Sequence, residues 1–301
     1  MPKMRKWLCL AAALLACTGA RAAVVVSSKL DSEATMLSQM VRLLLNANGI
    51  PTIDRTRIGA TPVVRKALLT GEIDLYVEYT GNAGFFFNEV ADPAWRNLAA
   101  GYARGARLDL DANHIVWLTP ARANNTWALA IRSDVAAAGR LASMSDFGRW
   151  VAGGGKVMLA CSAEFANAGT LQSLEKTYGF TLNPQQKIVL AGGETAATIG
   201  AAAAGTNGVN TAMVYSTDGG IVAARLVLLA DDRHEQPVYA PVPLVRQAVL
   251  EKYPQIAAIV KPLMESLTTE ELQRLNARVQ IDGESDQEVA ADYLRTRGLL
   301  K

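Results

Sequence analysis

Cysteine and histidine are the scarcest of the chemically reactive residues in this chain of 301 residues. There are three cysteines and two histidines, and of the cysteines only Cys161 lies beyond residue 22. No disulfide can therefore form within the rest of the chain, which must be stabilised by a hydrophobic core. His114 and His234 supply little material for a histidine-based triad or a metal site. We therefore expect neither a metal ion nor a cofactor.

Motifs of the common enzyme classes are also missing. The sequence has no Gly-x-Ser-x-Gly, no His-Glu-x-x-His and no glycine-rich loop that ends in Gly-Lys-Ser/Thr. A pair of carboxylates could still serve a hydrolase, but Glu78 and Glu164 are the only acids that we place in a cleft, and both favour a structural role. We therefore predict a protein that is not an enzyme, and a periplasmic enzyme on the same scaffold is the weaker alternative.

Apolar runs long enough to span a membrane are absent. Residues 8–17 form an unbroken apolar stretch, which is far shorter than the ~20 residues that a spanning helix needs. This stretch follows basic residues and precedes a small-x-small pattern at 20–22, which is the order of a secretory signal. We predict cleavage after Ala22 and a periplasmic protein. The alternative is a lipid anchor at Cys17, because residues 14–17 loosely resemble a lipoprotein box.

A large excess of charge of either sign is lacking as well. The chain has 30 Lys and Arg against 28 Asp and Glu, a formal net charge of +2. The predicted signal holds four of the basic residues and no acid, so the processed chain has a net charge of about −2. Clustered Lys and Arg would mark a nucleic-acid-binding face, and we expect no nucleic-acid partner.

What the sequence does contain is an alternation of short apolar segments with helix-like periodicity. This alternation predicts an α/β fold with mostly parallel sheets. Thr61 and Pro62 predict a capped helix start, and Gly71 ends that helix; residues 268–271 and 285–288 are capping-box patterns. Beyond about residue 253 the pattern is entirely helical. The predicted strands are 24–28, 52–57, 73–79, 114–118, 127–132, 157–160, 187–190, 212–215, 225–229 and 238–245.

The distribution of these elements predicts two lobes. Residues 24–120 form one α/β unit, and residues 133–230 form a second one that is richer in alanine and glycine. The C-terminal helices need a sheet to cover, so the simplest arrangement returns the chain to the first lobe. Two lobes joined by two crossover strands leave a central cleft, where ligands bind at strand ends. The predicted boundaries are 1–22 for the signal, 23–127 and 235–301 for lobe 1, and 128–234 for lobe 2.

Four polar turns follow predicted strands and carry aromatic, amide or charged side chains. Lys29 precedes a helix start, where it could help free N–H groups to hold an anion; a capped turn with a solvated lysine explains this segment equally well. Tyr79 and Tyr215 end strands before hydroxyl-rich turns, although packing is the more frequent role of such rings. Asn124 lies at the first crossover, where a hinge role is favoured, and Trp127 is expected in the core.

Together these turns describe a cleft with aromatic faces, hydroxyls and one anion site. A trimethylammonium group has no N–H to donate, so ring faces hold it through a cation–π attraction of ~0.5–2 kcal/mol per ring. A zwitterion such as glycine betaine also needs a cationic or N–H-rich pocket for its carboxylate. The set of side chains therefore suits a small quaternary-ammonium solute.

Several short segments, in order along nearly all of the processed chain, carry a resemblance to a known family. They are 27–33, 61–65, 71–82, 92–95, 117–120, 124–127, 162–165, 215–219 and 239–243. On these segments the chain resembles the glycine betaine/choline-binding proteins of osmoprotectant ABC transporters. The Phe-Phe-Phe run at 85–87 is typical of an enterobacterial periplasmic subgroup.

This resemblance implies a bilobal periplasmic-binding-protein fold of type II, a ligand such as glycine betaine or choline, and an ABC permease in the inner membrane as partner. It implies that Tyr79 and Tyr215 are cage rings, that Lys29 contacts a ligand carboxylate and that Asn82 lies beside them. We expect the protein to be a monomer. The full set of candidate ligand-binding residues is Lys29, Tyr79, Asn82, Asn124, Glu164, Tyr215 and Thr217.

Three positions depart from the pattern of that family. Ala121 stands where many members have a tyrosine, residues 166–169 contain no arginine to grip a ligand carboxylate, and a tyrosine is missing near Thr195. A cage of two rings would remain, and the lost contacts could cost several kcal/mol, at ~1 kcal/mol per ring and ~1.5–3 for a charged hydrogen bond. We therefore expect weak binding of glycine betaine, or another ligand. The alternatives are a receptor for a different small polar solute and a sensory partner that does not transport.

Overall fold

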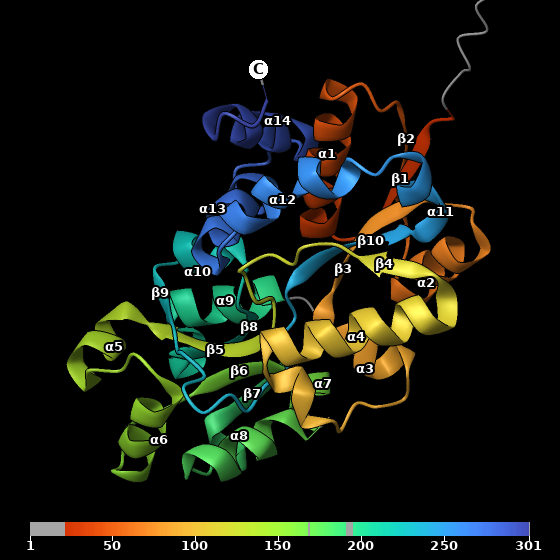
Figure 1. Ribbon diagram of the computed structural model, residues 1–301. Helices are drawn as coiled ribbons and strands as arrows, with labels where there is room; N and C mark the ends of the chain where they lie inside the picture. The colour runs from red at the N-terminus through yellow and green to blue at the C-terminus, as the bar shows by residue number, and fades with distance from the viewer. Residues whose placement is uncertain (1–21, 168, 191–194, 301) are drawn as a thin grey trace, which may run out of the picture.

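Two five-stranded sheets organise the chain (Figure 1). The computed structural model describes residues 22–167, 169–190 and 195–300, and the predicted signal and Cys17 lie outside them. The strand order is β2-β1-β3-β10-β4 in the first sheet and β7-β6-β8-β5-β9 in the second. Helices connect and cover the strands, which confirms the predicted α/β class.

Each predicted strand is present, although several differ at their ends by one to three residues. The alternation of apolar segments with turn residues therefore located the strands correctly. The first sheet contains β1 (Val24–Lys29), β2 (Thr52–Gly59), β3 (Leu75–Tyr79), β4 (Ile115–Trp117) and β10 (Pro241–Arg246). The second contains β5 (Trp127–Arg132), β6 (Leu159–Ser162), β7 (Lys187–Leu190), β8 (Thr211–Tyr215) and β9 (Leu226–Leu228).

Both sheets are mixed, and the prediction of mostly parallel sheets is confirmed for four of the five strands in each. One strand in each sheet runs antiparallel to both of its neighbours: β10 beside β3 and β4, and β5 beside β8 and β9. These are the strands by which the chain enters a sheet from the other one. The chain leaves the first sheet after β4 and enters the second as β5, then leaves after β9 and returns as β10. We call the connecting segments, 118–126 and 229–240, the first and second crossovers.

The helices lie between and beyond these strands, and the described chain is helical after β10, as predicted (Figure 1). In the first half they are α1 (Ser32–Ala47), α2 (Thr61–Thr70), α3 (Ala83–Phe86), α4 (Leu98–Asn113), α5 (Ser133–Gly139) and α6 (Met144–Ala152). Next come α7 (Ala163–Asn167), α8 (Thr170–Tyr178), α9 (Thr195–Ala204) and α10 (Gly219–Ala223). The C-terminal helices are α11 (Gln247–Lys252), α12 (Ile256–Ser266), α13 (Thr269–Gln280) and α14 (Asp286–Thr296).

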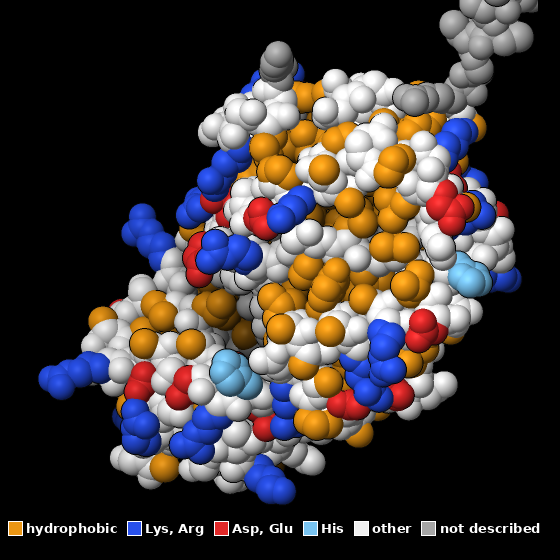
Figure 2. Space-filling model, in the orientation of Figure 1, with side chains coloured by type: hydrophobic (Ala, Val, Ile, Leu, Met, Phe, Trp, Pro, Cys, Tyr) orange, Lys and Arg blue, Asp and Glu red, His pale blue; other side chains and the backbone are white. Residues whose placement is uncertain are grey.

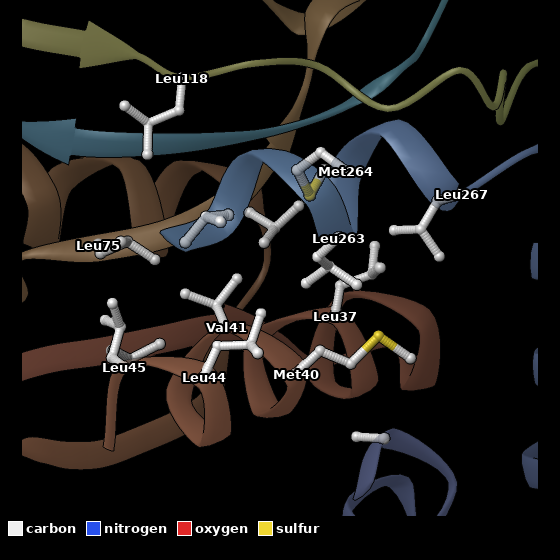
Figure 3. Close-up of a cluster of buried hydrophobic side chains, with 14 of the residues drawn as sticks. Leu37, Met40, Val41, Leu44, Leu45, Leu75, Leu118, Leu263, Met264 and Leu267 are labelled. Carbon is white, nitrogen blue, oxygen red and sulfur yellow. The ribbon is translucent and has the colours of Figure 1, made fainter. Parts of the chain in front are cut away.

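The C-terminal helices return to the first sheet because α1 presents them with an apolar stripe. Leu37, Met40, Val41, Leu44 and Leu45 repeat at three- and four-residue spacing, so that they share one face of α1. All are buried, in one cluster with Leu263, Met264 and Leu267 from α12 and its end. Figure 3 shows the two sets of side chains pointing toward one another.

The predicted helix ends are partly confirmed. Ser285 and Glu288 form a capping box at the start of α14, Thr268 caps α13 by accepting from the Glu271 N–H, and Gly71 ends α2 in a left-handed conformation, with φ of 79°. The cap predicted at Thr61 is wrong. Thr61 is already helical, and Ala60 precedes it as an N-cap without a side-chain hydrogen bond.

Within the ranges that the structure describes, no helix combines the length and the apolar character that crossing a membrane requires.

Candidate functional site

A cleft of about 820 Å³ lies between the two sheets. Figure 2 shows the surface hollowed between the upper and lower parts of the molecule. Six of the predicted site residues line the cleft: Lys29, Tyr79, Asn82, Glu164, Tyr215 and Thr217. Asn124 is not among the lining residues. A smaller hollow of about 540 Å³, between α6 and α8, contains none of them.

Lys29, at the end of β1, already has a carboxylate partner. Its ammonium group forms an ion pair with Glu78, and both side chains are buried. The sheet register explains the pair: Ser27 lies beside Tyr76 in parallel strands, so two residues further along Lys29 lies beside Glu78. Glu78 also accepts from Tyr76 Oη at 2.9 Å and from Asn82 Nδ2 at 2.8 Å. The anion site predicted at this turn is therefore occupied by an internal carboxylate.

Tyr79 is the ring that the same ammonium covers. Lys29 Nζ lies 4.5 Å from the centroid of the Tyr79 ring, and the Tyr79 hydroxyl donates to Glu33 Oε1 at 2.7 Å. The ring is almost fully buried, at 6% exposure. Its role as a cage ring stays a prediction, and a ligand cation would approach it beside a charge of the same sign.

Glu33, in the first turn of α1, is a site residue that sequence reasoning missed. It lies in the cleft wall but is buried. Besides Tyr79, it accepts from Asn125 Nδ2 at 2.9 Å and from Asn276 Nδ2 at 2.5 Å. Burial raises the pKa of Glu33, and hydrogen bonds from Thr217, Tyr79 and Asn276 offset part of that rise. The carboxylate therefore joins the first sheet, the first crossover and a C-terminal helix.

The acids of the cleft differ from those predicted. Asp31, Glu33 and Asp218 line the cleft together with Glu164, whereas Glu78 is fully buried and is not a lining residue. The prediction that Glu78 and Glu164 are its only acids was therefore wrong. Asp31 and Glu33 could have been suggested by their position, since both follow the end of β1 at the start of a helix.

Five aromatic residues line the cleft, and we call three of them, Trp127, Tyr215 and Tyr239, the aromatic wall. Trp127 and Tyr215 are register partners in the antiparallel pair β5–β8, and their ring centroids are 6.3 Å apart with 37° between the planes. Trp127 also packs edge-on against Phe165, at 5.8 Å. The expectation that Trp127 belongs to the core is met in part, because Trp127 packs against the core cluster of the second sheet but is half-buried and lines the cleft.

Acidic residues that line both sides of the cleft act on the hydroxyl of Tyr215. Burial raises the pKa of this phenol, and the charges of Glu164, Asp218 and Asp31 raise it further. Asp31 follows β1 of the first sheet, whereas Glu164 and Asp218 follow β6 and β8 of the second. Negative charges from both sides of the cleft thus converge near the aromatic wall.

The crossovers are fastened to each other by Asn124 and Asn125. Asn124 Oδ1 accepts from the Tyr239 N–H at 2.8 Å, and the Asn125 N–H donates to the Tyr239 carbonyl at 2.9 Å. The Ser216 hydroxyl donates to the Asn124 carbonyl. These contacts support the hinge role that the sequence favoured for Asn124.

Two glycines of the resembling motifs allow close packing around the cleft. A Cβ on Gly81 would lie 2.7 Å from Cε1 of Tyr239, and a Cβ on Gly219 would lie 2.2 Å from the backbone nitrogen of Ala277 in α13. At the same place Asn276 Nδ2 donates to the Thr217 carbonyl at 2.8 Å. Helix α13 therefore packs directly against the turn after β8, which belongs to the second sheet.

The departures from the family pattern have structural counterparts. Ala121 is buried in the core beneath the first sheet, where its N–H donates to the Pro241 carbonyl. No arginine lines the cleft within the described ranges; residues 168 and 191–194, near Phe165 and Thr195, lie outside them. Phe85, Trp127 and Tyr239 line the cleft together with Tyr79 and Tyr215, and the two-ring cage of Tyr79 and Tyr215 stays a prediction.

Known proteins are similar to the chain over its whole length. A family described as the substrate binding domain of ABC-type glycine betaine transport systems matches residues 22–296. The glycine betaine-binding protein YehZ of Escherichia coli (strain K12) is 45% identical over 305 residues, with 100% of both chains covered. A glycine-betaine-binding protein of Pseudomonas aeruginosa is 32% identical over 311 residues, 100% of this chain and 96% of its own. The solved structure of apo YehZ matches with a TM-score of 0.87 at 46% identity, over 92% of this chain and 99% of that one.

Proposed function

Because the chain belongs to the family of substrate-binding domains of ABC-type glycine betaine transport systems, we propose that it captures a small quaternary-ammonium solute between its two lobes. The solute is of the kind of glycine betaine or choline. The protein delivers it chemically unchanged to an ABC permease in the inner membrane. We propose that it acts as a monomer in the periplasm.

The observation that carries this proposal is the aromatic wall inside the cleft. Trp127 and Tyr215 stand side by side with ring centroids 6.3 Å apart, and Tyr239 completes the wall from the second crossover. A trimethylammonium group cannot accept or donate a hydrogen bond, so ring faces are its natural partners, each worth ~0.5–2 kcal/mol. The volume of about 820 Å³ leaves room for such a solute before closure.

Closure follows from the way the chain crosses between the sheets. We propose that the two crossovers bend and bring the first-sheet lobe, residues 23–127 and 235–301, against the second, residues 128–234. The ligand is then held by residues from both lobes. Lys29, Asn82, Glu164 and Thr217 line the cleft with Tyr79 and Tyr215, and we propose that they complete the site on closure. Asn124 contributes through the crossover backbone.

Calorimetric titration of the exported protein with glycine betaine, choline and carnitine tests the proposal, with arginine as the control solute. We expect saturable heat with at least one quaternary amine and none with arginine. Tyr215→Ala should weaken binding about 3- to 30-fold, because it removes one ring of the wall. Tyr215→Phe keeps the ring and serves as the matched control, with affinity close to that of the wild type. No heat with any quaternary amine up to tens of millimolar would contradict the proposal.

A further inference from the structure

We propose that the cleft selects a ligand of net positive charge, an organic ammonium that carries no carboxylate, over a zwitterion such as glycine betaine. The ligand class is that of choline, with a quaternary nitrogen and a hydroxyl group. This inference rests on the proposed function, because it specifies the charge of the solute that the same cleft receives. Three features of the described residues support it.

The first feature is the balance of charge. Asp31, Glu33, Glu164 and Asp218 line the cleft, whereas Lys29 is the single basic residue among the lining residues that the structure describes. The ion pair with the buried Glu78 cancels the charge of Lys29. Within the described ranges neither Asp31 nor Glu164 takes part in an ion pair, and Glu164 is exposed to the cleft. A ligand carboxylate would enter a field of its own sign, whereas a cation is attracted by it.

The second feature is the set of hydrogen-bonding atoms that remain free. Asn125 Oδ1, Thr126 Oγ1 and Asn276 Oδ1 are buried without a partner, and all three residues line the cleft. Asn276 donates both amide N–H groups, to Glu33 and to the Thr217 carbonyl, and Asn125 donates one N–H to Glu33. Free acceptors suit a ligand that donates, such as one with a hydroxyl group, and glycine betaine has no donor.

The donors left for a ligand carboxylate are few and uncharged. Trp127 Nε1 and the Thr126 hydroxyl are buried donors without a partner among the described lining residues, and other tyrosine and threonine hydroxyls remain. Asn82 Nδ2 donates to Glu78 at 2.8 Å. A carboxylate moved from water into the cleft would therefore lose strong hydrogen bonds without a cationic partner to replace them.

The third feature is the place where the ammonium group would bind. The aromatic wall lines the same cleft as Glu164, Asp218 and Asp31, and Asp218 Oδ2 accepts from the Tyr215 N–H at 2.8 Å. The face of Tyr79, by contrast, is covered by the Lys29 ammonium, 4.5 Å from the ring centroid. A ligand cation therefore binds at the wall, where ring faces and carboxylates both attract it.

The test is a set of titrations of the exported protein with choline, tetramethylammonium and glycine betaine at low and at high NaCl. We expect choline to bind at least about tenfold more tightly than glycine betaine at low salt, with a smaller difference at high salt. Tetramethylammonium keeps the charge and lacks the hydroxyl, so it should bind between the two. Glu164→Gln should weaken choline about 3- to 10-fold and so lower the preference for choline over glycine betaine.

Glu251→Gln is the matched control, because it removes the same charge from an exposed position on α11 outside the cleft. It should leave both affinities unchanged. Asp31→Asn, which retains an oxygen to cap α1, should repeat the effect of Glu164→Gln. Glycine betaine binding as tightly as choline, or Glu164→Gln weakening both ligands equally, would overturn the inference while the proposed function stands. If none of the three ligands binds, the proposed function fails as well.

Discussion

The close packing of α13 against the turn after β8 predicts that Gly219→Ala is destabilising. The added Cβ would lie 2.2 Å from the Ala277 nitrogen and 2.5 Å from its Cα. These are backbone atoms, so no side chain can rotate away to make room. Because carbon contacts are most favourable at ~3.5–4.0 Å, the helix and the turn must separate by about 1 Å.

The magnitude follows from the cost of overpacking, which is ~1–3 kcal/mol for an inserted methyl group. A loss of about 2 kcal/mol would lower the midpoint of thermal unfolding by roughly 4–8 °C, at ~2–4 °C per kcal/mol for a protein of this size class. The same separation lengthens the bond from Asn276 to the Thr217 carbonyl, now 2.8 Å. Ligand affinity should therefore fall together with stability.

Gly200→Ala provides the matched control for this variant. Gly200 lies in α9, and a Cβ there would meet nothing within 4 Å. Alanine favours the helix over glycine by ~0.5–1 kcal/mol, so this variant should be slightly more stable than the wild type. Both variants can be followed by circular dichroism during heating and in urea. If Gly219→Ala unfolds at the wild-type temperature, the close contact between Gly219 and the backbone of α13 is refuted.

Three further predictions concern the cleft wall. Lys29→Met leaves the buried Glu78 without its cation and should cost ~3–5 kcal/mol in urea unfolding; Lys29→Met with Glu78→Gln should recover part of that loss, and no recovery would contradict the pairing. Gly81→Ala places a Cβ 2.7 Å from the Tyr239 ring and should weaken ligand binding in titration, an effect that Tyr239→Ala in the same chain should no longer show. Burial raises the pKa of Glu33 above 4.5, so the native state retains this proton to higher pH than the unfolded chain does. The free energy of unfolding of the wild type should fall relative to that of Glu33→Gln as pH rises above about 4.5 and be parallel below it; parallel curves at every pH would contradict this.

The strands and the motif-bearing turns could be predicted because their signals are local. Each strand is a short apolar segment between turn residues, and the turns at Tyr79 and Tyr215 stand where strands end. The antiparallel direction of β5 and β10 could not be predicted in this way. It depends on how the crossovers enter each sheet, and no local sequence pattern determines that.

The site contacts that were missed join residues far apart in sequence. Asn276 reaches Glu33 across 243 positions, because α13 packs back on the first lobe. The pairing of Lys29 with Glu78 depends on the order of β1 and β3 in the sheet, and knowledge of that order would have revealed it. The pairing of Trp127 with Tyr215 was missed for the same reason, since the strand of Tyr215 follows much later in the chain. Without this pairing, Trp127 was expected in the core.

The fastening of the two crossovers has a mechanical consequence. A single crossover between two lobes would allow twisting as well as bending. Two crossovers that are hydrogen-bonded to each other restrict the lobes to rotation about one hinge axis. Asn124 and Asn125 of the first crossover are hydrogen-bonded to Tyr239 of the second, and Tyr239 is also a member of the aromatic wall. If the lobes close as we propose, Tyr239 lies on the axis of the motion, so this part of the aromatic wall should keep its position relative to the crossovers.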